Sequence, residues 1–547
     1  MRVPEDSTAV TEPPRITTAA PGPTSTERAW RRAVAVLTLL VGAWAATWAV
    51  LTPPLFSADE QNHLNSAVRL AYGGGWPAPG DAYFGPAVEA AVDESGYPSD
   101  LPGRYRDRDN QPQFVDLEPR PDAERTRIDA STALPAPDAD PSGLTVDQMT
   151  QHPPAYYALG ALVLRATGLA EGRWDVALTA LRLLDVVLLM PVVPLVASAT
   201  RRVTGSRSAG LVAATFPLFV PQLGHIMGAA NNDALVVLTS AVATYLAVRV
   251  VTGDLRWRVA VALGVVVGLG MLTKVMVVFV LPTVVAAYLL VRRVPWRRRL
   301  SRLVVALGLA AVVGGWWWVR NYLTLGAVQP VGRPRDLSKV PLLPREELVH
   351  ESVGRLAQAF WGNTGWLDVH LSGRFVVTGS LLLVALALVA VVMPGARRAS
   401  VVVLLVPGAL AAGVLYNAID FWTETQQLIA VQGRYVFGGI AALAVVVGIA
   451  VWQLAWRAEP RAAIGAAASC VLGVAAAGAG LAWGVTTMYQ GPGDSLAQTL
   501  DRWAAWSALT GPQLVLVAAL FAALAVLAVV LCVRWAVLQR GPASRAA

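Results

Sequence analysis

The stretch VAVLTLLVGAWAATWAVL at residues 34–51, followed closely by PPLFSADEQNH at residues 53–63, decides the class of this protein. The first segment is an unbroken apolar run of the length that a membrane-spanning helix needs, roughly 20 residues. The second segment places Asp59, Glu60 and His63 just beyond the end of that helix. Ionisable groups at the edge of lipid are costly unless they are used. Together the two segments predict a membrane protein with a chemically active site beside its first helix.

The rest of the chain repeats the apolar pattern. Of its 547 residues 55% are hydrophobic and only 15% are charged. Further apolar runs lie near 155–168, 177–199, 208–222, 233–251, 257–272, 275–292, 301–319, 375–393, 399–416, 435–455, 462–486 and 513–535. Each is expected to be helical, because a helix satisfies its own backbone hydrogen bonds in lipid. The sequence therefore predicts an all-α, polytopic bundle of about 12–13 transmembrane helices with a long first extracytoplasmic loop.

The arginines between these runs predict the orientation. Positively charged loops stay in the cytoplasm, which places the N-terminus inside and the loops 53–150 and 320–374 outside a cell membrane. The arginine pattern is consistent only if the short run 155–168 does not cross completely; the open alternative is an ordinary crossing with arginines that break the charge rule. The net charge of +8 thus reflects membrane topology and not a nucleic-acid partner.

Three regions are expected along the chain. Residues 1–29, rich in Pro, Thr and Ser, predict a disordered cytoplasmic tail. Residues 30–455 are expected to form the catalytic membrane module, and residues 456–547 are expected to add C-terminal transmembrane helices. Cys470 and Cys532 both lie in apolar runs, so neither a disulfide framework nor a cysteine metal site is expected in the outer loop.

Asp59 is the candidate catalytic base, because an alcohol must lose its proton to become a nucleophile and a neighbouring carboxylate can accept it. Glu60 is the adjacent catalytic candidate, and His63 lies one helical turn further on. His63 could orient these carboxylates or share a divalent metal with them, although the spacing matches no specific metal motif. The structural alternative is that Asp59 and Glu60 only favour the first turn of a helix.

Several polar residues near the other helix ends could join this site. His152 opens the short run 155–168 and would face the same aqueous space as Asp59. Lys274 is set between apolar runs and must have an anionic partner, either Asp233 or a lipid phosphate. The remaining candidates for binding a phosphate or substrate are Arg320, Arg434 and Tyr435. Arg182 and Asp185, three residues apart in an apolar run, are expected to neutralise each other.

The order of these motifs along residues 30–455 resembles that of the GT-C superfamily of polytopic glycosyltransferases. It is most similar to a poorly characterised bacterial branch related to the lipid A aminoarabinose transferases and protein O-mannosyltransferases. The motifs are Pro-Pro with Asp59-Glu60 and His63, then His152-Pro-Pro-Ala-Tyr-Tyr, Asn232-Asp233, Leu-Thr-Lys274, Trp317 with Arg320-Asn321, and Gln-Gly-Arg434-Tyr435.

The resemblance implies a sugar transfer from a polyprenyl-phosphate donor to an extracytoplasmic glycan, lipid or protein, normally with inversion. It assigns the catalytic carboxylate to Asp59 and the phosphate contacts to Lys274 and Arg434. The sequence contains no P-loop and no dinucleotide fingerprint, which argues against a soluble nucleotide-sugar donor. Two alternatives stay open: a transporter or flippase of a lipid-linked sugar, which predicts ionisable groups near the bilayer midplane, and a non-catalytic membrane protein of envelope assembly.

Overall fold

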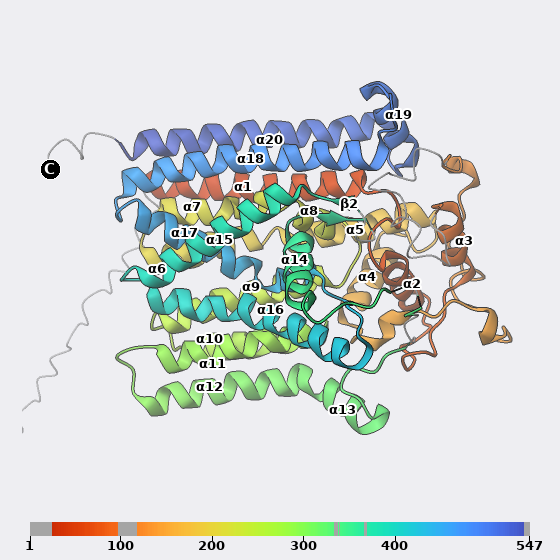
Figure 1. Ribbon diagram of the computed structural model, residues 1–547, viewed down its shortest axis with the longest axis horizontal. Coiled ribbons are helices and arrows are strands. Elements are labelled where there is room, and N and C mark those ends of the chain that lie inside the picture. Colours follow the sequence, from red (N-terminus) through yellow and green to blue (C-terminus); the bar gives the residue numbers. More distant parts are fainter. Residues whose placement is uncertain (1–24, 97–117, 333–336, 339, 366–368, 541–547) are drawn as a thin grey trace, which may run out of the picture.

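The computed structural model describes residues 25–96, 118–332, 337–338, 340–365 and 369–540. Most of these residues are helical, and the long helices lie side by side in one bundle (Figure 1). The α-helices are α1 Ser25–Leu51, α2 Glu60–Ala71, α3 Pro86–Glu94, α4 Ala155–Ala166, α5 Trp174–Leu189, α6 Val192–Thr204, α7 Arg207–Thr215, α8 Pro221–Met227, α9 Asp233–Val251, α10 Trp257–Met271, α11 Leu281–Leu290, α12 Trp296–Ala310, α13 Trp316–Leu325, α14 Leu348–Trp361, α15 Gly373–Val392, α16 Arg397–Thr425, α17 Ile440–Leu454, α18 Glu459–Tyr489, α19 Leu496–Trp506 and α20 Gly511–Leu538.

Short irregular helices and one small strand pair connect these elements. The short helices are η2 Asp122–Glu124, η3 Pro141–Gly143, η4 Gln148–Gln151, η5 Phe216–Phe219, η6 Val275–Val280, the π-helix η7 Ala311–Gly315 and η8 Gly433–Gly439. Strands β1 Asn363–Thr364 and β2 Val369–His370 pair antiparallel, with Asn363 opposite His370. The prediction of an all-α polytopic membrane protein is therefore confirmed.

The number of membrane passes agrees with the lower end of the expected range. In the described residues nine helices are long and apolar enough to cross a membrane, and a tenth pass counts the pair α7–η5 and α8, which is bent by 74°. The shorter α10 runs antiparallel to α9, since five residues join them at one end and Lys274 bonds to Asp233 at the other. The η6–α11 segment returns alongside, where Arg299 near the start of α12 donates to the Leu289 carbonyl. If these two shorter segments are counted as well, the described residues offer twelve candidate passes.

Helix α4 is the segment whose crossing the sequence left open. It has 12 residues, about 18 Å of helix at 1.5 Å per residue, against roughly 30 Å of hydrocarbon. Its N-terminal Ala155 donates to the Leu272 carbonyl beside Lys274. Beyond its C-terminus, Trp174 contacts Glu94 and Gly172 accepts from Ile128, both residues of the first loop. Both ends of α4 therefore lie on the side of the first loop, and α4 does not cross.

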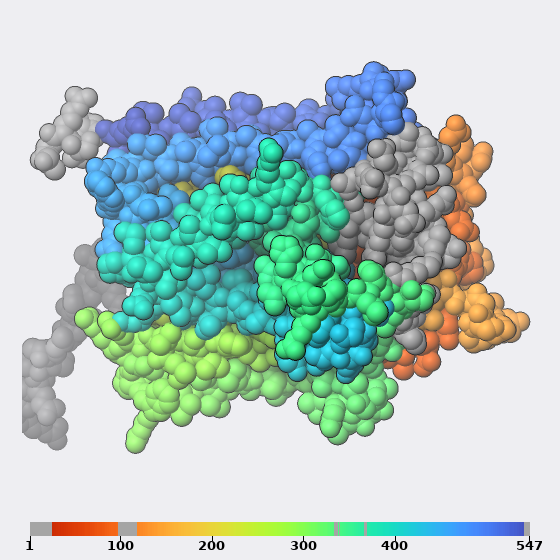
Figure 2. Space-filling model, in the orientation of Figure 1, coloured from red at the N-terminus to blue at the C-terminus, as the bar shows by residue number. Residues whose placement is uncertain are grey.

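The first loop, α13 and α19 lie towards one end of the bundle, and α20 finishes at the opposite end (Figure 1). Figure 2 shows the red-to-orange surface of the first loop confined to that same end of the molecule. The expected tail 1–29 falls mainly on residues 1–24, outside the described residues, while Ser25 already begins α1. The C-terminal helices α18 and α20 pack against α1, so the two ends of the chain lie side by side in the bundle.

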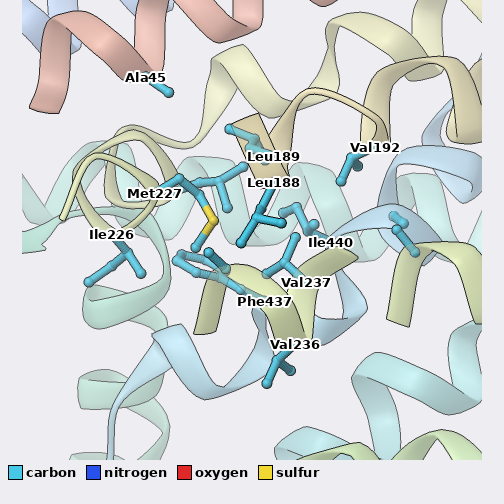
Figure 3. Packing of buried hydrophobic residues seen from close by; sticks show 14 of the residues in the cluster. Ala45, Leu188, Leu189, Val192, Ile226, Met227, Val236, Val237, Phe437 and Ile440 are labelled. Atoms are coloured by element: carbon cyan, nitrogen blue, oxygen red, sulfur yellow. The ribbon is translucent and has the colours of Figure 1, made fainter. Parts of the chain in front are cut away.

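The interior of the bundle is apolar and tightly packed. Leu188 and Leu189 of α5 meet Met227 of α8, Val237 of α9 and Phe437 of η8 (Figure 3). All five side chains are almost completely inaccessible to solvent, which is the condition for full hydrophobic stabilisation. This cluster fixes α5, α8, α9 and η8 against one another, and the same four elements carry much of the polar site described next.

Candidate functional site

Four charged side chains from four separate segments form a chain of alternating sign. The Lys274 ammonium lies 2.6 Å from Asp233 Oδ1, and Asp233 Oδ2 lies 3.9 Å from Arg434 Nε. Arg434 Nη2 donates to Asp59 Oδ2 at 2.8 Å. Lys274, Asp233 and Arg434 are buried, whereas the Asp59 side chain keeps 33% of its exposure. The structure thus brings four of the predicted residues together, and Asp59 forms the accessible end of the chain.

The end of α1 and the start of α2 position Asp59. Pro53 and Pro54 follow α1 and cannot continue it, because proline lacks the backbone N–H that a helix needs. Asp59 then precedes α2 in the left-handed conformation, with φ 68°. A residue with a side chain adopts this conformation at a cost of roughly 1–2 kcal/mol. The Arg434 guanidinium holds this turn, since it also donates to the Ala58 carbonyl at 3.4 Å.

The breaks between helices position the two cations. Lys274 follows α10 in an extended conformation and directly precedes η6, and Arg434 lies in η8 before α17. The Tyr435 ring lies between them, with its centre 5.0 Å from Lys274 Nζ and 5.4 Å from Arg434 Cζ. An aromatic face attracts cations at such distances. Tyr435 therefore belongs to the site, and Asp233, one of the two partners considered for Lys274, is the partner found.

The centre of the chain keeps unused hydrogen-bonding capacity. Within the described part of the protein, neither Arg434 Nε nor the buried Asp233 Oδ2 has a hydrogen-bond partner. Buried polar atoms are nearly always satisfied in native proteins, by the chain, by water or by a ligand. An arginine with a free N–H beside a lysine is a favourable arrangement for binding an anion with several oxygens.

His63 lies beside this chain as part of a polar and aromatic network. Its Nδ1 is 3.0 Å from the Tyr157 hydroxyl, which also accepts from Asn232 Nδ2 at 3.3 Å. The His63 and Tyr157 rings stack, with centres 5.7 Å apart. Burial, followed by the charges of Lys274 and Arg434, holds the pKa of His63 well below its usual value. His63 is therefore neutral at physiological pH and takes part in hydrogen bonds as a neutral ring.

His152 lies on the same side, immediately before α4. Its carbonyl accepts from Trp76 Nε1 at 3.0 Å, and the Trp76 ring packs on Tyr157. Burial, and then the charge of Lys274, lowers the pKa of His152 to about 3. The expectation that His152 would share a space with Asp59 is consistent with the effect of the Asp59 charge on its pKa.

The neutral state of His152 predicts a pH dependence of stability. Its pKa in the folded protein is depressed below the unfolded value of about 6.5, so the unfolded chain binds the extra proton between these values. Stability should therefore fall as the pH is lowered from about 6.5 towards 3, by up to roughly 1.4 kcal/mol per pH unit from this residue. Thermal unfolding in detergent at pH 7, 6, 5 and 4 measures it. The His152→Gln variant should show a smaller fall; an unchanged slope would contradict the assignment.

Glu60 is held by an arginine inside the bundle, Arg182, and not by Arg434. Arg182 Nε and Nη2 donate to its two carboxylate oxygens, each at 2.7 Å, and Ala230 N–H donates to Oε1 at 3.0 Å. Glu60 has no exposed surface. The expectation that Arg182 and Asp185 neutralise each other is wrong: Arg182 pairs with Glu60, and Asp185 accepts from the Asn231 N–H at 2.8 Å. In the folded chain each of the two residues therefore binds a partner that is distant in sequence: Glu60 binds Arg182, and Asn231 binds Asp185.

Arg320, like Glu60, is a predicted residue that the structure leaves outside the charged chain of Lys274, Asp233, Arg434 and Asp59. It lies exposed on α13, its guanidinium is 5.2 Å from the centre of the Trp317 ring, and its hydrogen bond goes to Asn321. No three His, Cys, Asp or Glu side chains of the described ranges converge as metal ligands would.

Two partners in the site were not predicted from the sequence. Tyr157 is the partner of His63, and Arg182 is the partner of Glu60. The signal for Arg182 was present, since a charge within an apolar helix needs a partner.

Gly433 allows η8 to approach α14 closely enough to place Arg434. A Cβ atom on Gly433 would lie 2.1 Å from the Phe360 backbone nitrogen and 2.4 Å from the Ala359 carbonyl carbon. Neither backbone atom can move without shifting α14. The Gly433→Ala variant should therefore lose several kcal/mol of stability, as overpacking a rigid contact does. Thermal unfolding measures it, with Gly354→Ala as the control, because a Cβ at Gly354 of α14 would meet nothing within 4 Å. Equal unfolding temperatures for the two variants would refute this.

Three-dimensional comparison finds solved structures of similar fold. The structure of ArnT from Cupriavidus metallidurans bound to undecaprenyl phosphate has a TM-score of 0.47 at 13% identity, over 93% of this chain and 76% of that one. The archaeal oligosaccharyltransferase AglB from Archaeoglobus fulgidus, in complex with an inhibitory peptide and a dolichol-phosphate, has a TM-score of 0.46 at 13% identity, over 87% of this chain and 58% of that one.

Sequence comparison defines the family. A search of the curated proteins found no match to this chain. The model of a family described as "Predicted membrane protein (DUF2142)" matches residues 42–447, a span that includes Asp59, Asp233, Lys274 and Arg434. The chain therefore belongs to the DUF2142 family of membrane proteins.

Proposed function

We propose that this protein is a membrane glycosyltransferase that moves a sugar from a polyprenyl-phosphate donor to an acceptor outside the cell membrane. One observation carries the proposal. The partly exposed Asp59 carboxylate ends a buried chain that contains two cations, Arg434 and Lys274. Transfer of a sugar from a lipid phosphate requires these two features side by side: a base for the acceptor hydroxyl and positive charge for the departing phosphate.

The reaction assigns a role to each member of the chain. The acceptor oxygen attacks the anomeric carbon while its proton passes to Asp59, and the bond between that carbon and the phosphate oxygen breaks. The bonding electrons leave with the polyprenyl phosphate. Lys274 and Arg434 stabilise the negative charge that develops on it. Attack from the face opposite to the phosphate inverts the configuration at the anomeric carbon.

Arg434 would exchange partners when the donor binds. Asp59 and Asp233 neutralise Arg434 and Lys274, so the charges of the site balance. A phosphate can take the place of the Asp59 oxygen on the Arg434 guanidinium, because a guanidinium binds either group through paired N–H donors. The exchange frees the Asp59 carboxylate at the moment when it is needed as a base.

The surroundings of the site support a lipid-linked donor. Asp233 and Arg434 lie at the ends of candidate membrane-spanning segments, and a lipid-linked donor is held in the same bilayer. The loop between α1 and α4 supplies many carboxylates and lies at the same end of the bundle (Figure 1). We propose that this end is extracytoplasmic, because the arginine-rich turns belong to the other end. The acceptor would then be an envelope glycan, lipid or protein.

The test follows a labelled sugar. Proteoliposomes are given undecaprenyl phosphate esters of radiolabelled glucose, mannose or arabinose, with an extract of cell envelope as acceptor. The proposal expects label to move from the lipid into the polar acceptor with at least one of the three sugars. Label that crosses the bilayer while still on its lipid would show a flippase. Label that neither moves nor crosses, with any of the three donors, would overturn the proposal in favour of a non-catalytic protein.

A further inference from the structure

Beyond its first turn, helix α5 carries two buried charged residues that have no role in the proposed reaction. Arg182 and Asp185 lie three residues apart and keep 3% and 0% of their exposure. Burying charges is unfavourable unless hydrogen bonds and partners compensate for the lost water. What these two residues bind indicates why an otherwise apolar helix carries them.

Arg182 joins three segments of the chain. Besides its two bonds to Glu60, it donates from Nη1 to the carbonyls of Ala49 and Thr52, both at 2.7 Å. It also donates from Nη2 to the Pro53 carbonyl at 3.0 Å. The last turn of α1 and the first residue of α2 are thereby held on one guanidinium. Asp59 lies within this segment, directly before Glu60.

Asp185 holds the turn between α8 and α9, which carries Asp233, in the same way. Its Oδ2 accepts from the Asn231 N–H, and Asn231 Oδ1 accepts from the Asp233 N–H at 2.9 Å. The Asn231 side chain also donates to the carbonyls of Ile226 and Ala229. The turn between α8 and α9 is thus fixed from α5. Asp233 is the residue that this turn presents to Arg434 and Lys274.

Glu60 connects the hydrogen bonds made by Arg182 with those made by Asp185. Its Oε1 accepts from Arg182 and also from the Ala230 N–H, and Ala230 directly precedes Asn231. The turn that carries Asp59 and the turn that carries Asp233 are therefore tied to each other through one carboxylate. Both of its oxygens are engaged by these hydrogen bonds.

We infer that Arg182 and Asp185 of α5, with Glu60, form a positioning element that sets the separation between the Asp59 and Asp233 carboxylates. Arg434 can contact both carboxylates only at this separation, so the element determines where the cation and the base stand. In this assignment Glu60 is a positioning residue and not a second catalytic carboxylate. The inference rests on the proposed function, because it concerns the geometry of that same site.

The first test compares Glu60→Gln with Glu94→Gln in the labelled-sugar assay. The glutamine introduced by Glu60→Gln keeps one acceptor oxygen, so one of the paired bonds to Arg182 is lost and the turn should shift. We expect kcat to fall about 10- to 100-fold, with the KM for the donor changed less than threefold and the shape of the pH profile unchanged. Glu94 is likewise a buried carboxylate, bound by Arg120, Thr126 and Trp174, away from the site. Its glutamine variant should keep kcat within twofold of the wild type.

The second test uses Asp185, which guards against a Glu60 variant that does not fold. Asp185→Asn keeps the acceptor for the Asn231 N–H and should stay within threefold of the wild-type kcat. Asp185→Leu has nearly the same shape but no acceptor, and its kcat should fall at least tenfold. Recovery by the conservative variant is what a positioning role predicts.

Two results would overturn the inference. In the first, Glu60→Gln matches Asp59→Asn in losing about 10³-fold of the transfer rate and one limb of the pH profile, which would make Glu60 a base. In the second, Glu60→Gln and Asp185→Leu both keep wild-type kcat, which would show that the element sets nothing. A cryo-EM map of the same variants reads the Asp59–Arg434 contact directly: it should be broken in Asp185→Leu and intact in Glu94→Gln. The contact seen in the map tests the inference even if the wild type transfers no sugar. Absence of transfer by the wild type would contradict only the proposed function.

Discussion

The Asp59→Asn variant is expected to bind the donor but to lose about 10³-fold in the rate of sugar transfer, within the usual range of roughly 10²–10⁴ for removing a general base. Asparagine has nearly the same shape as aspartate and still offers an oxygen to Arg434, so the turn before α2 should survive. It cannot accept the proton of the acceptor hydroxyl. Initial rates with saturating labelled donor and acceptor measure the loss, and thermal unfolding checks that the variant is folded.

Asp138→Asn is the matched control for this change. Asp138 is an exposed carboxylate of the same loop, and its neutralisation should leave the rate within twofold of the wild type. A rate for Asp59→Asn that equals the rate for Asp138→Asn would remove Asp59 from the role of base. The charged chain would then be a structural feature of the end of the bundle that carries the first loop.

The Arg434→Lys variant should lower kcat/KM about 100-fold, or roughly 3 kcal/mol of transition-state stabilisation, as the loss of one group facing a developing charge usually does. Lysine keeps the positive charge beside Asp59 and Asp233 but lacks the planar set of N–H donors. It can contact Asp59 or Asp233, but it cannot bind a phosphate through two parallel hydrogen bonds. Steady-state rates at several donor concentrations measure this change.

Arg127→Lys is the corresponding control. Arg127 lies exposed in the first loop, where its guanidinium donates to the Glu171 carbonyl, far along the chain from Arg434. We expect kcat/KM within twofold of the wild type. Should Arg434→Lys also remain within twofold, charge alone would suffice at this position, and the paired contact with phosphate would be refuted.

Much of the fold follows from local chemistry and could be predicted from the sequence. Each apolar run became a helix, because a chain in lipid must satisfy its own backbone hydrogen bonds. The short α4 was recognisable by length alone, although its return to the side of the first loop required the contacts of Ala155 and Trp174. The 74° bend between η5 and α8 was not foreseen, even though Pro217 and Pro221 mark both sides of it.

The candidate site was predictable in its members and less so in their partners. Lys274 demanded an anion, and the sequence offered Asp233 or a lipid phosphate without a means to choose. Arg182 also needed an anionic partner, and the carboxylate nearest to it in sequence, Asp185, is not that partner. The true partner, Glu60, lies 122 residues away. Ion pairs in an apolar interior are decided by which segments meet, and periodicity along one helix does not contain that information.

By itself, the sequence determined that this chain is an α-helical membrane protein with a carboxylate, Asp59, at the mouth of its first helix, because hydropathy and the cost of charge in lipid act on each segment independently. Only the tertiary structure decided that Asp59 reaches Arg434, 375 residues away, and that Glu60 turns inward to Arg182 instead. It also decided that Arg320 stands apart from them. These outcomes depend on how α1, α5, α9 and η8 pack together, and packing is a property of the whole bundle.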